Sequence, residues 1–466
     1  MKIKFFSLAI ILAIFTSCAS SVAFAQQNSE DGRGQGLFTA EWHAARRAIL
    51  MDEIGKGLIV LRGAGTQNDY REFRQDNNFW YYTGITTPNA VLILAPESGE
   101  EYLLVPPVDA MSERWSGDLI DPEEAAAITG IKQCMPTGKK SRTVNYDNLE
   151  KSITKLLRGC KVKTIHVQEQ PAENWMMSRD NLMSAARSLI RDPYDQRKTR
   201  EAQFAKKIKE KHECEVKDIT VTLDALRVTK TPEEVTAMRR ACEVSGVAHI
   251  NIMRTARAGE YEWQLAARMT GDFLEESGLG AAYMAIVGSG LNATVLHYTA
   301  NNCQLELGDT VMIDYGAEFA HYVADISRTF PVADTFSDRQ REIYQAVYDA
   351  QEAAFTECKP GSNLNRVHNA AFKVLKDRGF GPDFWHGTSH WLGMATHDVG
   401  NFRATFEPGM AFTVEPGVYL PDEGIGVRIE DVVVITENGY ELISESIPRH
   451  IDEIEALRAI ANGHKG

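Results

Sequence analysis

Two aspartates interrupt an apolar stretch in the second half of the chain. Asp314 and Asp325 stand in the sequence MIDYGAEFAHYVADISRTF, whose other residues predict the interior of a β-sheet. Carboxylates are almost never buried unless another charge compensates for the lost hydration. We expect a hairpin that turns near Phe319–Ala320 and sets the two aspartates opposite each other. Like charges in that arrangement must either take up protons or bind a cation.

A second acidic pair follows in a repeat of the same pattern. The segment ELGDTVMIDYG aligns with EPGMAFTVEPG, which places Asp314 over Glu415. Each segment follows a predicted helix pair and precedes a strand with a further acid, Asp325 in the first and Glu430 in the second. We therefore predict an internal duplication: two α-α-β-β units face each other and direct four carboxylates into one cleft.

Histidines gather beside the second acidic segment. His386, His390 and His397 stand in WHGTSHWLGMATHDVG, and His297 stands in VLHYTAN. A site with mostly carboxylate ligands and an imidazole suits divalent ions such as Mn²⁺, Co²⁺ or Zn²⁺. The composition of this cluster therefore favours one or two divalent cations as its counter-charge.

The preceding residues predict a separate α/β domain with a partly parallel sheet. A helix that ends at Gly55 is followed by the strand GLIVLRG and by the strand, turn and strand of AVLILAPESGEEYLLVPP. Thr231, Pro232 and Glu234 then form a helix start with a capping box. We place one domain at residues 37–225 and a second, catalytic domain at 226–460.

The first 25 residues predict a signal peptide. Lys2 and Lys4 precede the apolar stretch FFSLAIILAIF, and Ala23 and Ala25 form a cleavage site. We expect an exported protein, periplasmic or secreted, with lipidation at Cys18 as the competing route. No later segment predicts a membrane span. The net charge of −14 and the lack of a basic stripe argue against a nucleic-acid or anionic-membrane partner.

The cysteines predict neither a zinc ribbon nor a redox pair. The chain has seven cysteines, and no two of them form a C-x-x-C motif. An exported protein can form disulfides, but a chain of 466 residues does not need them for stability. We therefore expect isolated thiols and assign no pair.

Motifs along the whole mature chain resemble the pita-bread metallopeptidases, most closely the aminopeptidase P (Xaa-Pro aminopeptidase) family. The N-terminal stretch FRQDNNFWYYTGITTPNAVLIL resembles that family's creatinase-type domain. Five further motifs resemble its catalytic domain in order: VGSGLNATVLHYTAN, IDYGAEFAHYVADISRTFPV, HGTSHWLGMATHDVG, TVEPGVY and GIGVRIEDVVVIT. The resemblance implies an α/β creatinase-like domain followed by an α+β pita-bread domain with a pseudo-twofold internal repeat.

The resemblance also implies a centre of two divalent metal ions, with Mn²⁺ as the first choice and Co²⁺ or Zn²⁺ as alternatives. The family's ligands fall on Asp314, Asp325, His390, Glu415 and Glu430. By the same resemblance, Asp325 and Glu430 bridge the ions, and Glu415 also carries a proton during catalysis.

Six further residues match family positions around the substrate. His297 and His397 match histidines that contact the substrate and stabilise the tetrahedral intermediate, and His386 matches a histidine near the proline pocket. Arg428 and Tyr419 match positions that orient ligands and substrate. Arg403 is the one candidate for a substrate-binding arginine in a segment that is shorter than in relatives.

The implied activity is hydrolysis of the bond between an N-terminal residue and a following proline in peptides. The first alternative is an Xaa-Pro dipeptidase (prolidase), which uses the same ligands. A more distant alternative is a non-catalytic pita-bread binding module. The family implies a homodimer or homotetramer, and the aromatic run Phe79–Tyr82 either packs in the N-terminal core or forms a rim for a neighbouring subunit's site.

Overall fold

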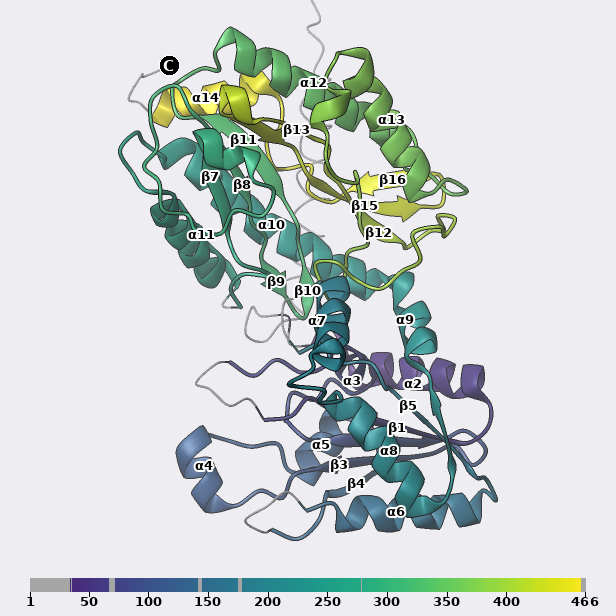
Figure 1. Cartoon of the computed structure of the whole chain (residues 1–466). Helices are drawn as coiled ribbons and strands as arrows, with labels where there is room; N and C mark the ends of the chain where they lie inside the picture. Colours follow the sequence, from purple (N-terminus) through teal and green to yellow (C-terminus); the bar gives the residue numbers. More distant parts are fainter. Residues whose placement is uncertain are drawn as a thin grey trace, which may run out of the picture.

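The computed structural model describes Gly34 and residues 36–66, 72–140, 145–174, 178–277 and 279–461. The predicted signal peptide and Cys18 lie outside these residues. The chain folds into two lobes, with the N-terminal lobe below and the C-terminal lobe above in Figure 1. Helix α10 (Pro232–Thr255) belongs to the upper lobe, and α9 (Thr220–Val228) leads into it. The predicted domain boundary after Ala225 therefore falls inside α9.

The N-terminal lobe is built on one six-stranded mixed sheet with the order β4-β3-β2-β1-β5-β6. Its centre is antiparallel, while β4, β5 and β6 pair in parallel with their neighbours. The strands are β1 (Leu58–Arg62), β2 (Val91–Ala95), β3 (Glu100–Val105), β4 (Gln133–Pro136), β5 (Thr164–Val167) and β6 (Glu215–Asp218). This sheet confirms the predicted α/β class. The edge strand β6 was not predicted, because its short sequence EVKD has no run of apolar residues.

The helices of this lobe are α2 (Ala40–Ile54), α3 (Asn77–Thr83), α4 (Ala110–Ser116), α5 (Pro122–Thr129), α6 (Asp147–Gly159), α7 (Arg179–Arg191) and α8 (Arg200–His212). Of these, α2, α5, α6 and α8 contact strands of the sheet, whereas α4 lies beside it and α7 lies at the junction of the two lobes (Figure 1). Helix α2 ends at Gly55 as predicted, and the Gly55 amide hydrogen closes the last turn on Met51. The Thr231–Glu234 capping box is present and begins α10.

The aromatic run Phe79–Tyr82 lies in α3 and is buried. None of its four side chains is more than 6% exposed. The side chains pack into a hydrophobic core that both lobes share, with Trp42 and Leu92 of the N-terminal lobe and Ala241 and Tyr322 of the C-terminal lobe. This burial confirms that the run packs in a hydrophobic core, although that core extends into the C-terminal lobe, and it speaks against a rim for a neighbouring subunit's site.

The C-terminal lobe repeats one pattern twice. The first unit holds α10, α11 (Glu262–Ser277), β7 (Ile286–Ser289), the 3₁₀ turn η1 (Gly290–Thr294), β8 (Thr310–Asp314), β9 (Glu318–Phe319), β10 (Tyr322–Val323) and β11 (Ser327–Pro331). The second holds α12 (Asp338–Phe355), α13 (Leu364–Asp377), η2 (Gly381–Asp383), β12 (Ala411–Val414), β13 (Gly417–Leu420), η3 (Pro421–Glu423), β14 (Ile425–Arg428), β15 (Asp431–Thr436) and β16 (Gly439–Leu442). Helix α14 (Ile451–Ala461) closes the described chain. A helix pair precedes the acidic strands in each unit, as the duplication predicts.

Each unit brings its two acids together through antiparallel strands. Strand β8 pairs with β11, and β12 pairs with β15. Asp314 is the last residue of β8, and Glu415 directly follows β12; Asp325 precedes β11 by two residues, and Glu430 directly precedes β15. The four carboxylates therefore all lie at strand ends on one side of the lobe.

The first hairpin has a different register from the predicted one. Its turn is Ala320–His321, since Phe319 pairs with Tyr322. In this register Asp314 pairs with Ser327. Asp325 consequently lies diagonal to Asp314 on the same face rather than directly opposite it. The predicted turn near Phe319–Ala320 would have paired Asp314 directly with Asp325. The observed turn lies one residue later, so the predicted direct pairing is wrong.

Cys134, Cys160, Cys214, Cys242, Cys303 and Cys358 are free thiols, as expected. Three of them are buried and Cys303 is exposed. Among the helices that the structure describes, none combines the length and hydrophobicity that crossing a bilayer needs.

Candidate metal centre

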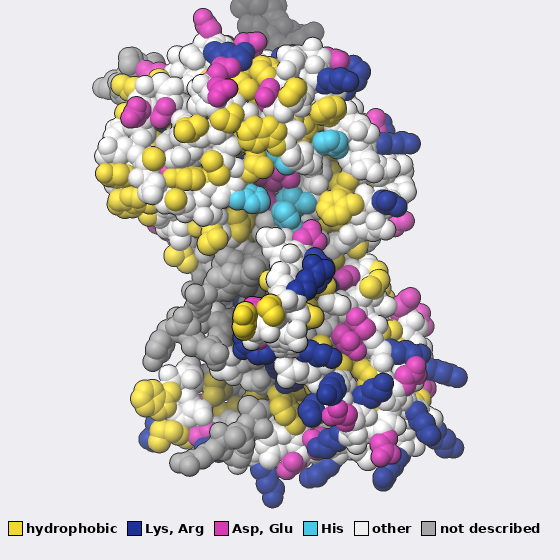
Figure 2. Space-filling view, viewed as in Figure 1, with side chains coloured by type: hydrophobic (Ala, Val, Ile, Leu, Met, Phe, Trp, Pro, Cys, Tyr) yellow, Lys and Arg dark blue, Asp and Glu magenta, His cyan; other side chains and the backbone are white. Residues whose placement is uncertain are grey.

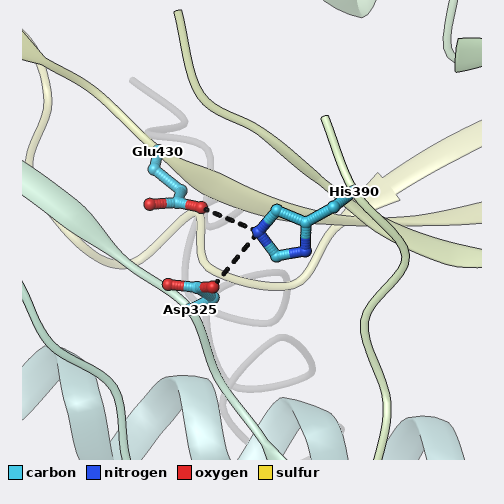
Figure 3. Close-up of side chains that lie close together, drawn as sticks. All are labelled: Asp325, His390 and Glu430. Atoms are coloured by element: carbon cyan, nitrogen blue, oxygen red, sulfur yellow. Dashed lines mark ion pairs between the residues drawn. The ribbon is translucent and has the colours of Figure 1, made fainter. Parts of the chain in front are cut away.

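Three predicted ligands form a tight buried group. Donor atoms of Asp325, His390 and Glu430 lie within 4.8 Å of one another. His390 Nε2 is 3.3 Å from Asp325 Oδ2 and 3.8 Å from Glu430 Oε1. Figure 3 shows the imidazole nitrogen facing both carboxylates, which come from two separate hairpins. The internal duplication therefore converges on one point.

The other two predicted ligands flank this group. Tyr283 Oη lies 2.6 Å from Oδ1 of both Asp314 and Asp325 and so links the two aspartates. On the other side of the cluster, Glu415 Oε1 lies 3.6 Å from His390 Nε2. All five residues that the family resemblance named thus lie in one cluster. Their individual roles as terminal or bridging ligands stay predictions.

The cluster carries more negative charge than its surroundings compensate for. Burial raises the pKa of Asp314 to about 6, and the neighbouring Asp325 carboxylate adds to the shift while Arg428 opposes it. Burial, followed by the charge of Asp325, raises the pKa of Glu430 well above its usual range. Burial raises the pKa of Glu415 to about 7, although His390 and Arg428 act against it. Without a cation, burial and mutual repulsion shift these carboxyl groups toward their protonated forms.

His390 is oriented as a ligand would be. Its Nδ1 lies 3.1 Å from the Trp391 carbonyl oxygen, so Nδ1–H donates there and Nε2 faces the carboxylates. Burial alone would lower the pKa of His390, but the hydrogen bond to Asp325 and the charge of Glu415 raise it to about 9. A divalent cation would displace this proton and those of the carboxyl groups. Four carboxylates with one oriented imidazole therefore fit hard to borderline divalent ions.

Arg428 bonds directly to one candidate ligand, Asp314, and through Ser327 to another, Glu430. Its Nη2 donates to Asp314 Oδ2 at 2.7 Å, and its Nε donates to Ser327 Oγ at 2.8 Å. The Ser327 hydroxyl donates in turn to Glu430 Oε2 at 2.7 Å. One buried guanidinium therefore orients a carboxylate from each half of the duplication.

A chain of hydrogen bonds leads from Arg428 to His386. Arg428 Nη1 donates to Tyr419 Oη at 3.1 Å, and the Tyr419 hydroxyl lies 2.8 Å from His386 Nε2. Because His386 Nδ1–H donates to the Gly387 carbonyl oxygen, Nε2 accepts from Tyr419. Burial and the charge of Arg428 lower the pKa of His386 to about 3, so this imidazole is neutral.

The two predicted catalytic histidines differ in exposure. His397 is half-buried, and its ring centre lies 4.0 Å from that of His390. Burial and then the charge of His390 lower the pKa of His397 to about 3. His297 is exposed, yet near enough that its charge also lowers the pKa values of His386 and His397. Figure 2 shows histidine side chains around a recessed acidic patch on the upper lobe.

Arg403 is not brought to this cluster. Its side chain is exposed and, within the described residues, forms no hydrogen bond or ion pair; only its backbone amide donates, to Asn401 Oδ1. Its proposed contact with substrate therefore has no support in a contact with any other site residue.

Tyr283 and Ser327 belong to the site but were missed from the sequence. Tyr283 precedes β7, whose Ile286 pairs with Asp314, so only knowledge of the β7–β8 pairing would have placed it here. Ser327 stands two residues after Asp325 in DISRTF, on the strand that pairs with β8. Neither residue carries a sequence signal of its own.

Comparisons with known proteins agree with this geometry. Residues 236–437 match metallopeptidase family M24, and residues 43–164 match the aminopeptidase P N-terminal domain. The Xaa-Pro aminopeptidase of Escherichia coli K12 is 32% identical over 457 residues, which cover 89% of this chain and 97% of that protein. The Xaa-Pro aminopeptidase of Haemophilus influenzae is 30% identical and covers 83% of this chain and 88% of its own length.

Solved structures show the same two-lobed fold. Pseudomonas aeruginosa aminopeptidase PepP superposes with a TM-score of 0.76 at 31% identity, over 91% of this chain and 98% of that one. Escherichia coli aminopeptidase P with the inhibitor Pro-Leu superposes with a TM-score of 0.75 at 29% identity, over 91% and 99% of the two chains.

Proposed function

Since this chain belongs to the Xaa-Pro aminopeptidases of metallopeptidase family M24, we propose that it hydrolyses the bond between an N-terminal residue and a following proline in peptides. The observation that carries the proposal is the convergence of Asp325, His390 and Glu430 within 4.8 Å, with Asp314 and Glu415 at their flanks. Such a cluster is a metal site by its chemistry, and the family is one of metal-dependent exopeptidases.

Two divalent ions, Mn²⁺ first and Co²⁺ or Zn²⁺ as alternatives, complete the proposed centre. The ligands proposed for them are Asp314, Asp325, His390, Glu415 and Glu430. When bound, the ions supply Lewis-acid activation of a water molecule and of the scissile carbonyl group. The chemistry of the donor atoms supports this proposal, because bound cations would compensate the negative charge of the buried carboxylates.

The side chains around the centre supply proton transfer and orientation. Glu415 has one carboxylate oxygen 3.6 Å from His390 Nε2 and the other 3.6 Å from His386 Nδ1. Its carboxylate therefore lies between the candidate ligand His390 and the predicted substrate-binding residue His386. Glu415 is proposed to take up a proton from the attacking water and to return it to the leaving amine. His397 and His297 are proposed to hydrogen-bond the developing oxyanion.

The alternative within the same class is an Xaa-Pro dipeptidase. Turnover of the tripeptide Ala-Pro-Ala and of the dipeptide Ala-Pro by protein reconstituted with Mn²⁺ separates the two. We expect the tripeptide to be cleaved to alanine and Pro-Ala, and good turnover of the dipeptide alone would favour the prolidase. A non-catalytic binding module would bind no transition metal in elemental analysis and would cleave neither peptide.

We also propose that the protein is exported, with cleavage after Ala25 and a periplasmic or secreted destination. The support is the leader sequence with its A-x-A site. Mass spectrometry of the mature protein from its host gives the test: an N-terminus at Gln26 is expected, while lipid-modified Cys18 at the N-terminus would replace this route by lipidation. A homodimer or homotetramer is proposed by family resemblance, and light scattering measures it.

A further inference from the structure

One arginine of the N-terminal lobe contacts two of the C-terminal-lobe segments that carry candidate ligands, the β9–β10 hairpin before Asp325 and the loop after His390. Arg74 Nε lies 3.1 and 3.2 Å from the two carboxylate oxygens of Glu318, the first residue of β9. Arg74 Nη2 donates to the Met394 carbonyl oxygen at 3.0 Å. Met394 stands between His390 and His397, and Glu318 lies seven residues before Asp325. A planar guanidinium holds its donors in a fixed fork, so this side chain fixes the two segments relative to each other.

Arg74 is held firmly from its own lobe. Its Nη1 donates to Asn77 Oδ1 at 2.6 Å. The Asn77 amide group donates to Glu173 Oε2 at 2.9 Å and to the Met394 carbonyl oxygen at 3.3 Å. The Arg74 side chain is only 11% exposed. The guanidinium is therefore part of a buried polar junction rather than a mobile surface group.

The β9–β10 hairpin, which Arg74 contacts at Glu318, has an unfavourable turn that other residues must stabilise. Its turn residues Ala320 and His321 have φ angles of 48° and 69°, in the left-handed region that favours glycine. Trp80 of α3 stacks on His321 with ring centres 4.2 Å apart, and Phe38 stacks on Tyr322 at 5.5 Å. Figure 1 shows β9 and β10 at the junction of the lobes. The N-terminal lobe thus supplies the packing that stabilises an unfavourable turn.

The hairpin and the histidine loop are also joined directly. The Val323 amide donates to the Gly393 carbonyl oxygen at 2.9 Å. Val323 precedes Asp325 by two residues, and Gly393 follows His390 by three. A shift of the hairpin therefore changes the 3.3 Å separation between Asp325 Oδ2 and His390 Nε2.

We propose that Arg74 is a positioning residue for the metal centre: from the N-terminal lobe it sets the distance between the Asp325 and His390 ligands. The N-terminal lobe then contributes to the geometry of the metal centre through this arginine. This inference rests on the proposed metal function of the cluster.

The test compares metal binding by two arginine variants. Arg74→Met removes the donors and keeps an unbranched side chain. Arg47→Met is the matched control, because Arg47 is buried and its hydrogen bonds to described residues all stay within the N-terminal lobe, to Glu101 and to the carbonyl oxygens of Tyr82 and Thr129. Mn²⁺ is titrated calorimetrically into chelator-treated full-length protein, and the visible spectrum is recorded with Co²⁺.

We expect Arg74→Met to weaken Mn²⁺ binding about tenfold, as changes behind metal ligands do, and to alter the Co²⁺ spectrum. Arg47→Met should lower thermal stability yet leave both metal readouts at the wild-type values. Equal Mn²⁺ affinity in wild type and Arg74→Met would overturn the positioning role. If the wild-type chain itself binds no Mn²⁺ or Co²⁺, the proposed metal function fails instead, so the two failures are distinguishable.

Two further variants keep the test decisive if Arg74→Met folds poorly. Glu318→Gln removes the charge that Arg74 grips and should weaken Mn²⁺ binding in the same direction. Arg74→Lys keeps the charge without the fork and should restore only part of the affinity. Wild-type metal affinity in Glu318→Gln would count against the proposal just as directly.

Discussion

Asp314 and Asp325 share one hydroxyl group, since Tyr283 Oη lies 2.6 Å from an oxygen of each carboxylate. A phenol has one proton and can donate to only one acceptor at a time. Burial and the two carboxylates keep the pKa of Tyr283 well above its usual range, so the phenol stays protonated. Arg428 donates a hydrogen bond to Asp314, and His390 Nε2 lies 3.3 Å from Asp325 Oδ2. The two buried carboxylates therefore depend on nearby positive charge, which Arg428 supplies to Asp314 and which protonated His390 or a bound metal ion would supply to Asp325.

Removing this shared hydroxyl should weaken the centre. Tyr283→Phe leaves the ring packing in place but takes away the hydroxyl that links the two aspartates. We expect metal affinity to fall about tenfold, with a parallel loss of kcat/KM at limiting metal. Calorimetric titration with Mn²⁺ measures the first effect. An unchanged affinity would show that the hydroxyl does not orient the two carboxylates.

Glu430→Gln tests the proposed bridging carboxylate. The substitution keeps the shape of a side chain that is 1% exposed but removes its negative charge. We expect activity to fall by about a hundredfold or more and the bound metal to decrease. Metal content by elemental analysis and peptide turnover are measured on one preparation. A variant with full metal and full rate would refute the bridging assignment.

Gly316 should tolerate no side chain. A Cβ atom there would lie 2.0 Å from the Ala324 carbonyl oxygen, which belongs to the residue before Asp325. Gly316→Ala must therefore push the two strands apart, at a cost of about 1–3 kcal/mol in the free energy of unfolding. Activity should fall with it, because Asp325 moves. Gly439→Ala is the matched control, since a Cβ atom there meets no neighbour within 4 Å. Equal stability of the two variants would contradict the close approach.

His43 should make stability depend on pH. Burial, with a smaller effect of Arg47, lowers the pKa of His43 from about 6.5 to about 4. The unfolded chain therefore takes up this proton first as the pH falls. The stability from the neutral ring is complete above pH 6.5 and declines toward pH 4, with a slope of at most about 1.4 kcal/mol per pH unit.

His43→Asn tests that pH dependence. The asparagine amide can donate to the Tyr81 carbonyl oxygen, which lies 3.0 Å from His43 Nδ1. We expect a lower free energy of unfolding at pH 7.5, because the smaller side chain fills less space, and a smaller loss between pH 6.5 and pH 4. Urea unfolding at several pH values measures both. Parallel curves for the variant and the wild type would exclude His43 as the titrating group.

Sequence patterns predicted many of the elements but not the registers of their pairing. Capping residues such as Thr231 and Ser337 mark helix starts by themselves, because caps act within one turn. The position of the hairpin turn could not be predicted in this way. Its residues Ala320 and His321 have left-handed backbone conformations, and neither is the glycine or asparagine that usually indicates such a turn. Packing from Trp80 on another lobe selects this turn, and local sequence does not contain that contact.

In the candidate site, too, the sequence predicted some residues and only the structure revealed others. The charge of the repeated acids and the neighbouring histidines predict a metal centre, and family resemblance names its ligands. Tyr283, Ser327 and Arg74 act on those ligands from other strands or from the other lobe. Their contribution arises from distances between segments that are far apart in sequence, so no spacing rule reveals it. Strand β6 was missed for a related reason, since an edge strand needs no apolar alternation.

The most direct test of the proposed activity is product analysis of Ala-Pro-Ala incubated with the full-length protein and Mn²⁺. Mass spectrometry should find alanine and Pro-Ala in equal amounts, with no cleavage after chelation and recovery when Mn²⁺ is restored. Cleavage of Ala-Pro but not of Ala-Pro-Ala, or cleavage that persists without metal, would contradict a metal-dependent Xaa-Pro aminopeptidase.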